Sequence, residues 1–376
     1  MSTQGAAPTL HVHIGTEKTG TTTLQSMANS NRPVLASHGL LYPLAPGKQN
    51  HAGLAVYALK SGGRPGLRYT ARLRGDDDVA AYRQSVMTRL REEIFDSGCP
   101  RVLLSNEHLS SRLRNTDAVL RLVEGLRTIS DDIRVLIYLR PQYELVVSSY
   151  STSVKSGRAT PIRLERSAHE HYYNYDKILE LWEKAVGIEN IQVRRFLPRE
   201  FVGGTLISDF FTALGMAVPA ELEVPGPRNR SLDANTLEFL RIVNENMPKF
   251  VDGDINEARA EILAGLQRIS SGAKFMVSGA ALAEIDTTFA TSNQAVAERY
   301  FPGGGPLFSP FTAVDTVPSP PLGVREAVEI GLALWSERGP RKRRRRLTAP
   351  AALEAETDAA AAARPRGRRR RDQREE

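Results

Sequence analysis

The chain has 376 residues, of which 41% are hydrophobic and 25% charged, values that are ordinary for a soluble globular protein with one large or two modest domains. Its one cysteine, Cys99, excludes an intramolecular disulfide, and no run approaches the ~20 apolar residues that cross a bilayer. The net charge of +7 belongs to the C-terminus, because residues 337–376 hold 14 Lys and Arg against 7 Asp and Glu, whereas the rest of the chain holds 36 of each.

The first quarter of the chain predicts a strand followed by helices and loops. The apolar pattern and the turn residues place a strand at 10–15, a helix at 21–31, an extended run at 38–42, a loop at 44–51, a short helix at 52–60, a loop at 61–76 and a helix at 78–97.

Three further strands are predicted, and two of them, at 100–105 and 132–139, are apolar runs typical of strands that are covered on both faces. They lie at 100–105, 132–139 and 191–196, and amphipathic helices are expected between and after them, at 116–129, 142–156, 172–186 and 205–214. Strands that alternate with helices imply parallel βαβ units. The predicted fold class is therefore α/β, a three-layer parallel sheet.

The pattern changes near residue 225. Helices are expected at 232–246, 255–270, 279–298 and 323–337, with a Pro- and Gly-rich loop at 301–321 and no strand. Arginine runs and alanine-rich low complexity follow, which is typical of disorder. We therefore divide the chain into a flexible N-terminus (1–8), an α/β core (9–224), a mostly helical segment packed on it (225–338) and a disordered tail (339–376).

The stretch after the first strand predicts a phosphate-binding loop. It reads HVHIGTEKTGTTTLQ from His11 to Gln25, with a glycine at each end of the loop and Lys18 inside it. Backbone N–H groups of such a loop, together with the positive end of the next helix, favour an anion. Gly15 and Gly20 have the spacing of the nucleotide-triphosphatase pattern, but Lys18 comes two residues before the second glycine and not directly after it.

Polar side chains also follow the next two long strands. Asn106, Glu107 and His108 follow the strand at 100–105, and Arg140 follows the strand at 132–139, with Ser148 eight residues later. Ligands gather at the carboxyl ends of parallel strands. A guanidinium and a hydroxyl two helical turns apart are able to hold one phosphate from two sides. Two separate phosphate sites indicate a nucleotide with phosphates at both ends.

These motifs resemble the sulfotransferases that use PAPS (3′-phosphoadenosine 5′-phosphosulfate). The family motif P-K-[ST]-G-T-[ST] appears as EKTGTT at 17–22, with Glu17 in place of the proline, and the second family motif appears as Arg140 with Ser148. Looser similarities are PR…EHL at 100–109 and GTL…FF…LG at 204–215. The resemblance covers roughly residues 9–220 and is nearer to bacterial members that act on glycans or other metabolites.

The resemblance implies a sheet of P-loop type and transfer of a sulfuryl group from PAPS to an acceptor hydroxyl. It implies that Lys18 stabilises the leaving phosphate oxygen and that Glu107 or His108 is the general base, with Glu107 first. The residues implied to bind the nucleotide are Lys18, Thr19, Gly20, Thr21, Thr22, Thr23, Arg140 and Ser148. No metal is implied, and the sequence has no cluster with metal-ligand spacing.

Several alternatives stay open. Tyr172, Tyr173, Tyr175 and Trp182 are either a packing face or include an adenine-stacking ring, and Arg228 and Arg230 are able to reach a 3′-phosphate. A phosphoryl transferase that uses NTP would share the loop but lacks an acidic strand end of the Walker-B kind. A third alternative is a non-catalytic protein that binds polyanions through its basic tail.

The remaining expectations concern partners. The acceptor is a small molecule or a glycan, specific nucleic-acid binding is not expected, and the tail is able to contact anionic surfaces. The N-terminus, Met1 to Pro8, has no basic region followed by an apolar run, so we expect a cytoplasmic protein. The sequence leaves the acceptor and the oligomeric state open.

Overall fold

A parallel five-stranded sheet forms the centre of the α/β part, with the strand order β2–β3–β1–β4–β5. The structure, a computed structural model, describes residues 7–60, 67, 73, 76–164, 171–224, 226, 231–252, 254–312 and 316–337. The strands are β1 (Thr9–Gly15), β2 (Leu40–Leu41), β3 (Arg101–Ser105), β4 (Ile133–Leu139) and β5 (Ile191–Arg195). The expectations for most of the N-terminus, most of the loop at 61–76, Arg228, Arg230 and the tail lie outside the described residues.

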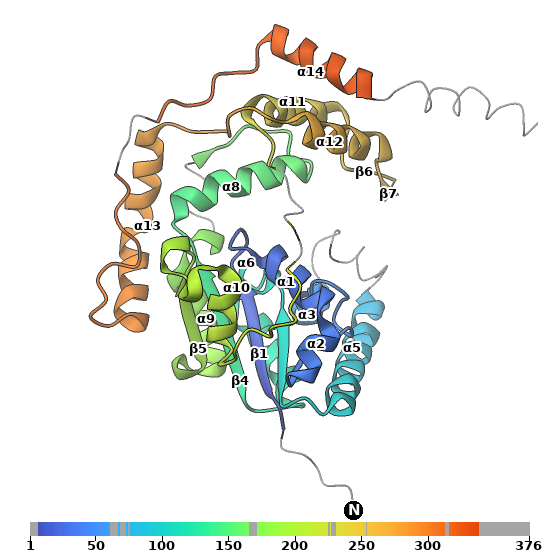
Figure 1. Ribbon diagram of the computed structural model, residues 1–376, viewed down its shortest axis with the longest axis vertical. Helices are drawn as coiled ribbons and strands as arrows, with labels where there is room; N and C mark the ends of the chain where they lie inside the picture. The colour runs from blue at the N-terminus through green and yellow to red at the C-terminus, as the bar shows by residue number, and fades with distance from the viewer. Residues whose placement is uncertain are drawn as a thin grey trace, which may run out of the picture.

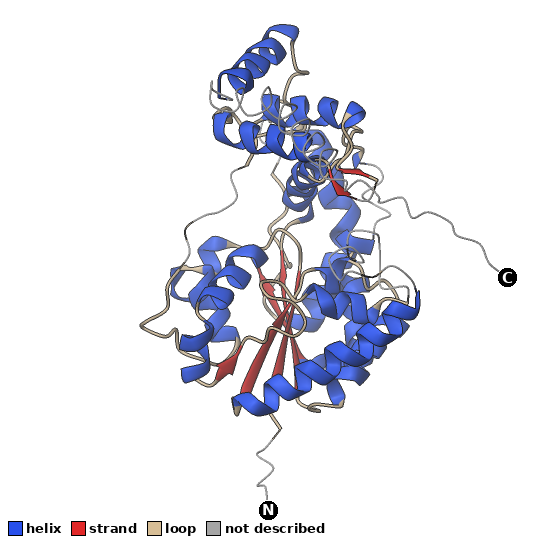
Figure 2. Cartoon of the chain, turned by 90° about the vertical axis from the view of Figure 1, so that its right-hand side faces the viewer, coloured by secondary structure: helices blue, strands red, loops and turns tan. Residues whose placement is uncertain are grey.

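Helices cover both faces of the sheet (Figure 2). The α/β part contains α1 (Thr21–Ser30), α2 (Arg32–Ser37), α3 (Ala52–Ala58), α5 (Asp76–Ser97), α6 (His108–Ser111), α7 (Thr116–Arg127), α8 (Gln142–Lys155), α9 (Tyr175–Val186) and α10 (Leu206–Ala213). The predicted fold class, α/β with a three-layer parallel sheet, is confirmed.

The layers follow from the alternation of side chains along each strand. In β4, Val135 and Ile137 join a core that includes residues of α7 and α9, whereas Leu136 and Tyr138 join a second core with residues of α1 and α10. Because both faces of the strand are covered, nearly every residue is apolar and buried. This explains why a continuous apolar run in the sequence predicts β4.

The C-terminal helices pack on the α/β part through α8 and α9 (Figure 1). Val154 of α8 is buried in a cluster with Leu240 and Leu266, and Phe289 and Val296 join the core that contains α9. The helices are α11 (Ala234–Asn246), α12 (Glu257–Ile269), α13 (Gly279–Tyr300) and α14 (Val324–Glu337). Among the described helices, we find none with the length and apolar composition that crossing a membrane requires.

The expectation that no strand follows residue 225 was wrong. A short antiparallel hairpin pairs β6 (Phe250–Val251) with β7 (Asp254–Ile255). Each strand has two residues, which is too short for an alternating pattern to show in the sequence.

Candidate functional site

A cavity of about 1100 Å³ lies at the carboxyl ends of β1, β3 and β4. It is lined by the loop after β1, by Glu107 and His108 after β3, by Arg140 after β4 and by one face of α8. Chains that follow parallel strands meet at the same edge of the sheet, and β1 lies between β3 and β4. The topology therefore brings three predicted strand-end motifs to one cavity.

The loop after β1 is held in a shape suited to an anion. Three residues have backbone φ angles that favour glycine, namely Gly15 (101°), Lys18 (66°) and Gly20 (76°). Thr16 donates from its N–H (2.9 Å) and its hydroxyl (3.1 Å) to the carbonyl oxygen of Tyr138. At Gly20, where α1 begins, no side chain of the described residues caps the helix. The helix start thus offers backbone N–H donors and a positive dipole end.

Lys18 lines the cavity beside other cations. Burial lowers the pKa of its ammonium group, and the positive charges of Lys155 and Arg140 lower this pKa further, while Glu17 opposes them. A partly desolvated ammonium interacts with an anion more strongly than one in water. The position of Lys18 is therefore suited to a charge that develops inside the cavity.

Arg140 connects the loop to α8. Its Nη1 donates to the carbonyl oxygen of Lys18 at 3.2 Å, while its Nε and Nη2 contact the Glu144 carboxylate, each at 2.8 Å. The guanidinium also lies over the ring of Phe196, 5.8 Å from its centroid. Ser148, on the same helix, lines the cavity as well. These contacts orient Arg140, and both Arg140 and Ser148 of α8 line the same cavity.

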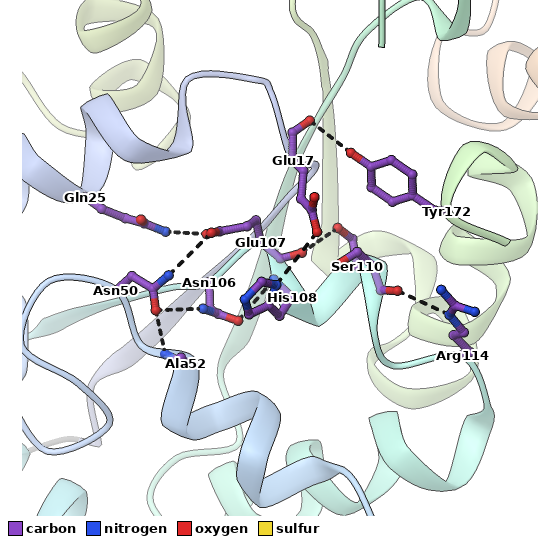
Figure 3. Close-up of polar contacts among 11 residues, drawn as sticks. Glu17, Gln25, Asn50, Ala52, Asn106, Glu107, His108, Ser110, Arg114 and Tyr172 are labelled. Carbon is purple, nitrogen blue, oxygen red and sulfur yellow. Dashed lines mark hydrogen bonds and ion pairs between the residues drawn. The ribbon is translucent and has the colours of Figure 1, made fainter. Parts of the chain in front are cut away.

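Glu107 is held by two side-chain amides (Figure 3). Gln25 of α1 donates to Oε2 at 2.8 Å, and Asn50 donates to Oε1 at 3.3 Å. Asn50 in turn accepts a 3.0 Å hydrogen bond from Asn106, whose own oxygen accepts from the N–H of His108 at 3.1 Å. The network fixes the carboxylate at the cavity wall, with lone pairs left over for a ligand.

His108 faces a different partner. Its Nδ1 lies 3.7 Å from Oε1 of Glu17, which is an ion pair when the imidazole is protonated (Figure 3). Burial alone would raise the pKa of the Glu17 carboxyl, but contacts with His108 and Ser111 and the charge of Arg112 hold this pKa below its ordinary value. Glu17 is therefore ionised near neutral pH and places a negative charge beside the His108 ring.

A buried histidine, His51, stabilises the backbone next to this network. His51 is fully buried, its Nε2 donates to the carbonyl oxygen of Pro43 at 2.9 Å, and its Nδ1 accepts from the N–H of Ser105 at 3.1 Å. Burial lowers the pKa of His51 to about 3. A neutral ring with a fixed tautomer thus anchors the end of β3 next to Asn50.

The structure brings together nearly all residues proposed from the sequence. Those that line the cavity are Lys18, Gly20, Thr21, Thr22, Thr23, Glu107, His108, Arg140 and Ser148. Thr19 is fully buried outside this lining, and its hydroxyl donates to the carbonyl oxygen of Thr16 at 2.7 Å. The side chain of Thr19 therefore stabilises the loop.

Other lining residues were missed or left undecided. Tyr172 and Tyr173 border the cavity, whereas Tyr175 and Trp182 are buried in the core only. Lys155 was missed, although its spacing of seven residues from Ser148 places both on one face of a helix. Gln25 and Asn50 carried no signal in the sequence, because their partner Glu107 is far away along the chain. The described residues contain no group of three or more His, Cys, Asp or Glu that could hold a metal ion.

Comparisons with known proteins give one distant likeness. No protein-family model and no curated protein matches the sequence. Among solved structures, a sulfotransferase from Alicyclobacillus acidocaldarius is similar, with 16% identity and a TM-score of 0.38 over 60% of this chain and 87% of that one. A likeness of this degree carries no information on activity, so the function rests on the chemistry of the cavity itself.

Proposed function

We propose that the protein is a sulfotransferase that moves a sulfuryl group from PAPS to an acceptor hydroxyl. The observation that carries this proposal is the joining of two phosphate motifs from separate strand ends. Lys18 and Arg140 line one cavity and are connected by a hydrogen bond. Hydroxyls, loop N–H groups, an ammonium and a guanidinium form a donor set that fits a nucleotide with phosphates at both ends.

The two sets of phosphate-binding residues, here called the phosphate grips, have distinct proposed roles. The loop N–H groups and Thr21, Thr22 and Thr23 bind the 5′-phosphate, while Arg140 and Ser148 bind the 3′-phosphate. When bound, PAPS supplies the sulfuryl group, whose bond to the 5′-phosphate oxygen breaks as the bond to the acceptor oxygen forms. Lys18 stabilises the negative charge that this phosphate oxygen gains, an effect of about 3 kcal/mol for a well-placed donor.

Glu107 is the proposed general base. The acceptor hydroxyl must lose its proton as it bonds to sulfur, and a carboxylate at the cavity wall is able to accept that proton. Gln25 and Asn50 hold the carboxylate in place. His108 is the alternative base, but its ring nitrogen is directed toward Glu17.

Calorimetry with adenosine 3′,5′-bisphosphate tests the proposal. We expect the wild-type protein to bind this nucleotide without added metal, and Arg140→Ala to weaken binding by about 10- to 100-fold, as befits a charge-assisted hydrogen bond. Arg134→Ala is the matched control, because Arg134 lies near the other end of β4 in an ion pair with Asp132. Equal affinities for wild type and Arg140→Ala would refute the 3′-phosphate assignment.

A different nucleotide preference would favour the phosphoryl-transferase alternative. Binding of ATP with Mg²⁺ in preference to adenosine 3′,5′-bisphosphate would favour it and overturn the sulfotransferase proposal. The polyanion-binding alternative predicts that deletion of residues 339–376 abolishes nucleotide binding, whereas the sulfotransferase proposal predicts that binding survives.

A further inference from the structure

The cavity carries more positive charge than the two phosphate grips use. Its lining includes seven Lys and Arg side chains against two carboxylates, Glu17 and Glu107. Lys18 and Arg140 belong to the proposed nucleotide site. The five surplus cations are Arg112, Arg114, Lys155, Arg158 and Arg163. They come from two parts of the chain, the turn after α6 and the C-terminal end of α8 with the segment that follows it.

Two of these cations line the same cavity as the loop after β1 and act on charged side chains of that loop. The positive charge of Arg112 acts on the Glu17 carboxyl, and the charge of Lys155 acts on the Lys18 ammonium. Within the described residues, neither the Arg112 guanidinium nor the Lys155 ammonium makes a hydrogen bond or an ion pair of its own. Both side chains are only partly exposed. A partly desolvated cation that contacts no carboxylate directly gains free energy from an anionic ligand.

Arg158 is fixed in place but not neutralised. Its guanidinium lies over the ring of Tyr150, 5.3 Å from the centroid, and donates to the carbonyl oxygens of Thr160 at 2.9 Å and Pro161 at 2.7 Å. Carbonyl oxygens satisfy N–H donors and leave the full positive charge. Arg158 is thus a preorganised cation at the cavity wall.

A buried arginine, Arg259, contacts the C-terminal end of α8 at this side of the cavity. The C-terminal end of a helix carries a partial negative charge, which would repel an anion near Lys155. Arg259 of α12 is 3% exposed, and its Nη2 donates to the last carbonyl oxygens of α8, on Val154 (3.2 Å) and Lys155 (2.8 Å). Asn244 donates to the same carbonyl of Val154 at 2.9 Å. The helical segment therefore offsets the negative helix end next to the surplus cations.

The rest of the lining is rich in hydroxyl groups. Besides the residues of the phosphate grips, the cavity is lined by the hydroxyl-bearing residues Thr152, Ser153, Ser156 and Thr160. Hydroxyl groups both donate and accept hydrogen bonds, so this wall suits a ligand that itself carries many hydroxyls.

We infer that the acceptor is an acidic saccharide, a sugar that carries carboxylate or sulfate groups, and that Arg112, Lys155 and Arg158 bind those groups beside the nucleotide. This inference rests on the proposed function, because it assigns the two phosphate grips to PAPS and the surplus cations to the acceptor. It adds the substrate class and the residues that select it.

The test uses the full chain saturated with adenosine 3′,5′-bisphosphate, so that the phosphate grips are filled. Two disaccharides of similar size are titrated by calorimetry, a sulfated chondroitin disaccharide and the neutral N-acetyllactosamine. We expect the acidic disaccharide to bind at least tenfold more tightly, with an affinity that falls as salt is added. The double variant Arg112→Ala with Lys155→Ala is expected to bind the acidic disaccharide at least tenfold more weakly than wild type. Lys184→Ala, an exposed cation of α9 outside the cavity lining, is the control and should bind like wild type.

The outcomes separate the inference from the proposed function. Wild-type protein that fails to bind the nucleotide would overturn the proposed function and, with it, this inference. Normal nucleotide binding with equal affinities for the two disaccharides would overturn the inference alone. Preferential binding of the acidic disaccharide that survives in the double variant would also overturn it, because the arginine-rich tail or another surface would then be the site. Unchanged nucleotide affinity of the double variant verifies that it is folded.

Discussion

Arg140 donates a hydrogen bond of 3.2 Å to the carbonyl oxygen of Lys18, although the two residues are 122 positions apart in the chain. The contact joins the loop after β1 to the end of β4, which lies beside β1 in the sheet. It fixes the spacing between the two groups that we propose to bind opposite ends of one nucleotide.

The first prediction concerns the pH dependence of turnover. In the proposed reaction Lys18 acts as an ammonium, so turnover should fall as pH rises through its pKa. Burial and the charges of Lys155 and Arg140 lower this pKa, so the fall should begin at a lower pH than for an ordinary lysine. Removing the repelling charge in Lys155→Met raises the pKa and should move the alkaline limb to higher pH. The measurement is the release of adenosine 3′,5′-bisphosphate from PAPS across pH, and Lys184→Met should leave the limb in place. An unmoved limb in Lys155→Met would exclude Lys18 as the titrating group.

The second prediction identifies the base. Glu107→Gln keeps the size of the side chain but cannot accept the proton, so kcat should fall by about 10²- to 10⁴-fold with little change in nucleotide affinity. His108→Asn should have the smaller effect, since its ring is directed toward Glu17. Steady-state rates of PAPS turnover and nucleotide calorimetry on both variants check this. A larger loss of kcat in His108→Asn would transfer the role to His108.

The third prediction concerns a buried ion pair beneath the sheet edge. The Asp209 carboxylate is 2% exposed and accepts hydrogen bonds from the Arg194 guanidinium, from the Tyr138 hydroxyl at 2.6 Å and from the N–H of Val202 at 3.0 Å. Asp209→Asn leaves Arg194 without its counter-charge and should lower the free energy of unfolding by about 3 kcal/mol near neutral pH. Urea denaturation measures this loss, and Asp131→Asn, an exposed acid, should change it little.

The contribution of the Asp209–Arg194 pair to the free energy of unfolding depends on pH. The direction of this dependence follows from the pKa of Asp209. Burial alone would raise this pKa, but the hydrogen bonds from Arg194 and Tyr138 hold it below its ordinary value. Its contribution to stability is therefore present above the unfolded-state pKa of about 4 and is lost as pH falls through the folded-state value. The stability gap between wild type and Asp209→Asn should thus narrow as pH falls from about 4 towards about 2. A constant gap over this range would contradict the assigned role of the carboxylate.

The fourth prediction concerns Gly20, which precedes α1. A Cβ atom there would lie 2.2 Å from Cδ2 of Leu206, and the φ of 76° already disfavours a side chain. Gly20→Ala should therefore lower the free energy of unfolding by about 2–4 kcal/mol, of which about 1–2 kcal/mol is the backbone term and the rest is the clash. Gly215→Ala is the matched control, because Gly215 has a φ of 66° and open space around it. The second substitution Leu206→Ala should relieve only the clash. Equal losses in Gly20→Ala and Gly215→Ala, measured by denaturation, would show that the packing at Gly20 is loose.

Local sequence determined much of the fold. The apolar runs at 100–105 and 132–139 identified β3 and β4, because a strand covered on both faces needs apolar residues at nearly every position. The conformation of the loop after β1 could be predicted for the same kind of reason, since glycine at two positions and a hydroxyl-rich helix start are local features of the sequence. Arg140 and Ser148 could be paired because two helical turns separate them.

Only the tertiary structure decided how these pieces meet. The two amides that hold Glu107 come from Gln25 and Asn50, and the arginine that caps α8 comes from α12. No local pattern encodes such contacts, because they depend on the strand order and on how the helices pack. Thr19 shows that a motif does not decide the role of each of its side chains. It belongs to the recognisable motif, but its hydroxyl donates within the loop and the residue lies outside the cavity lining. Sequence sets backbone conformation over a few residues, whereas packing over long separations sets which side chains face the cavity.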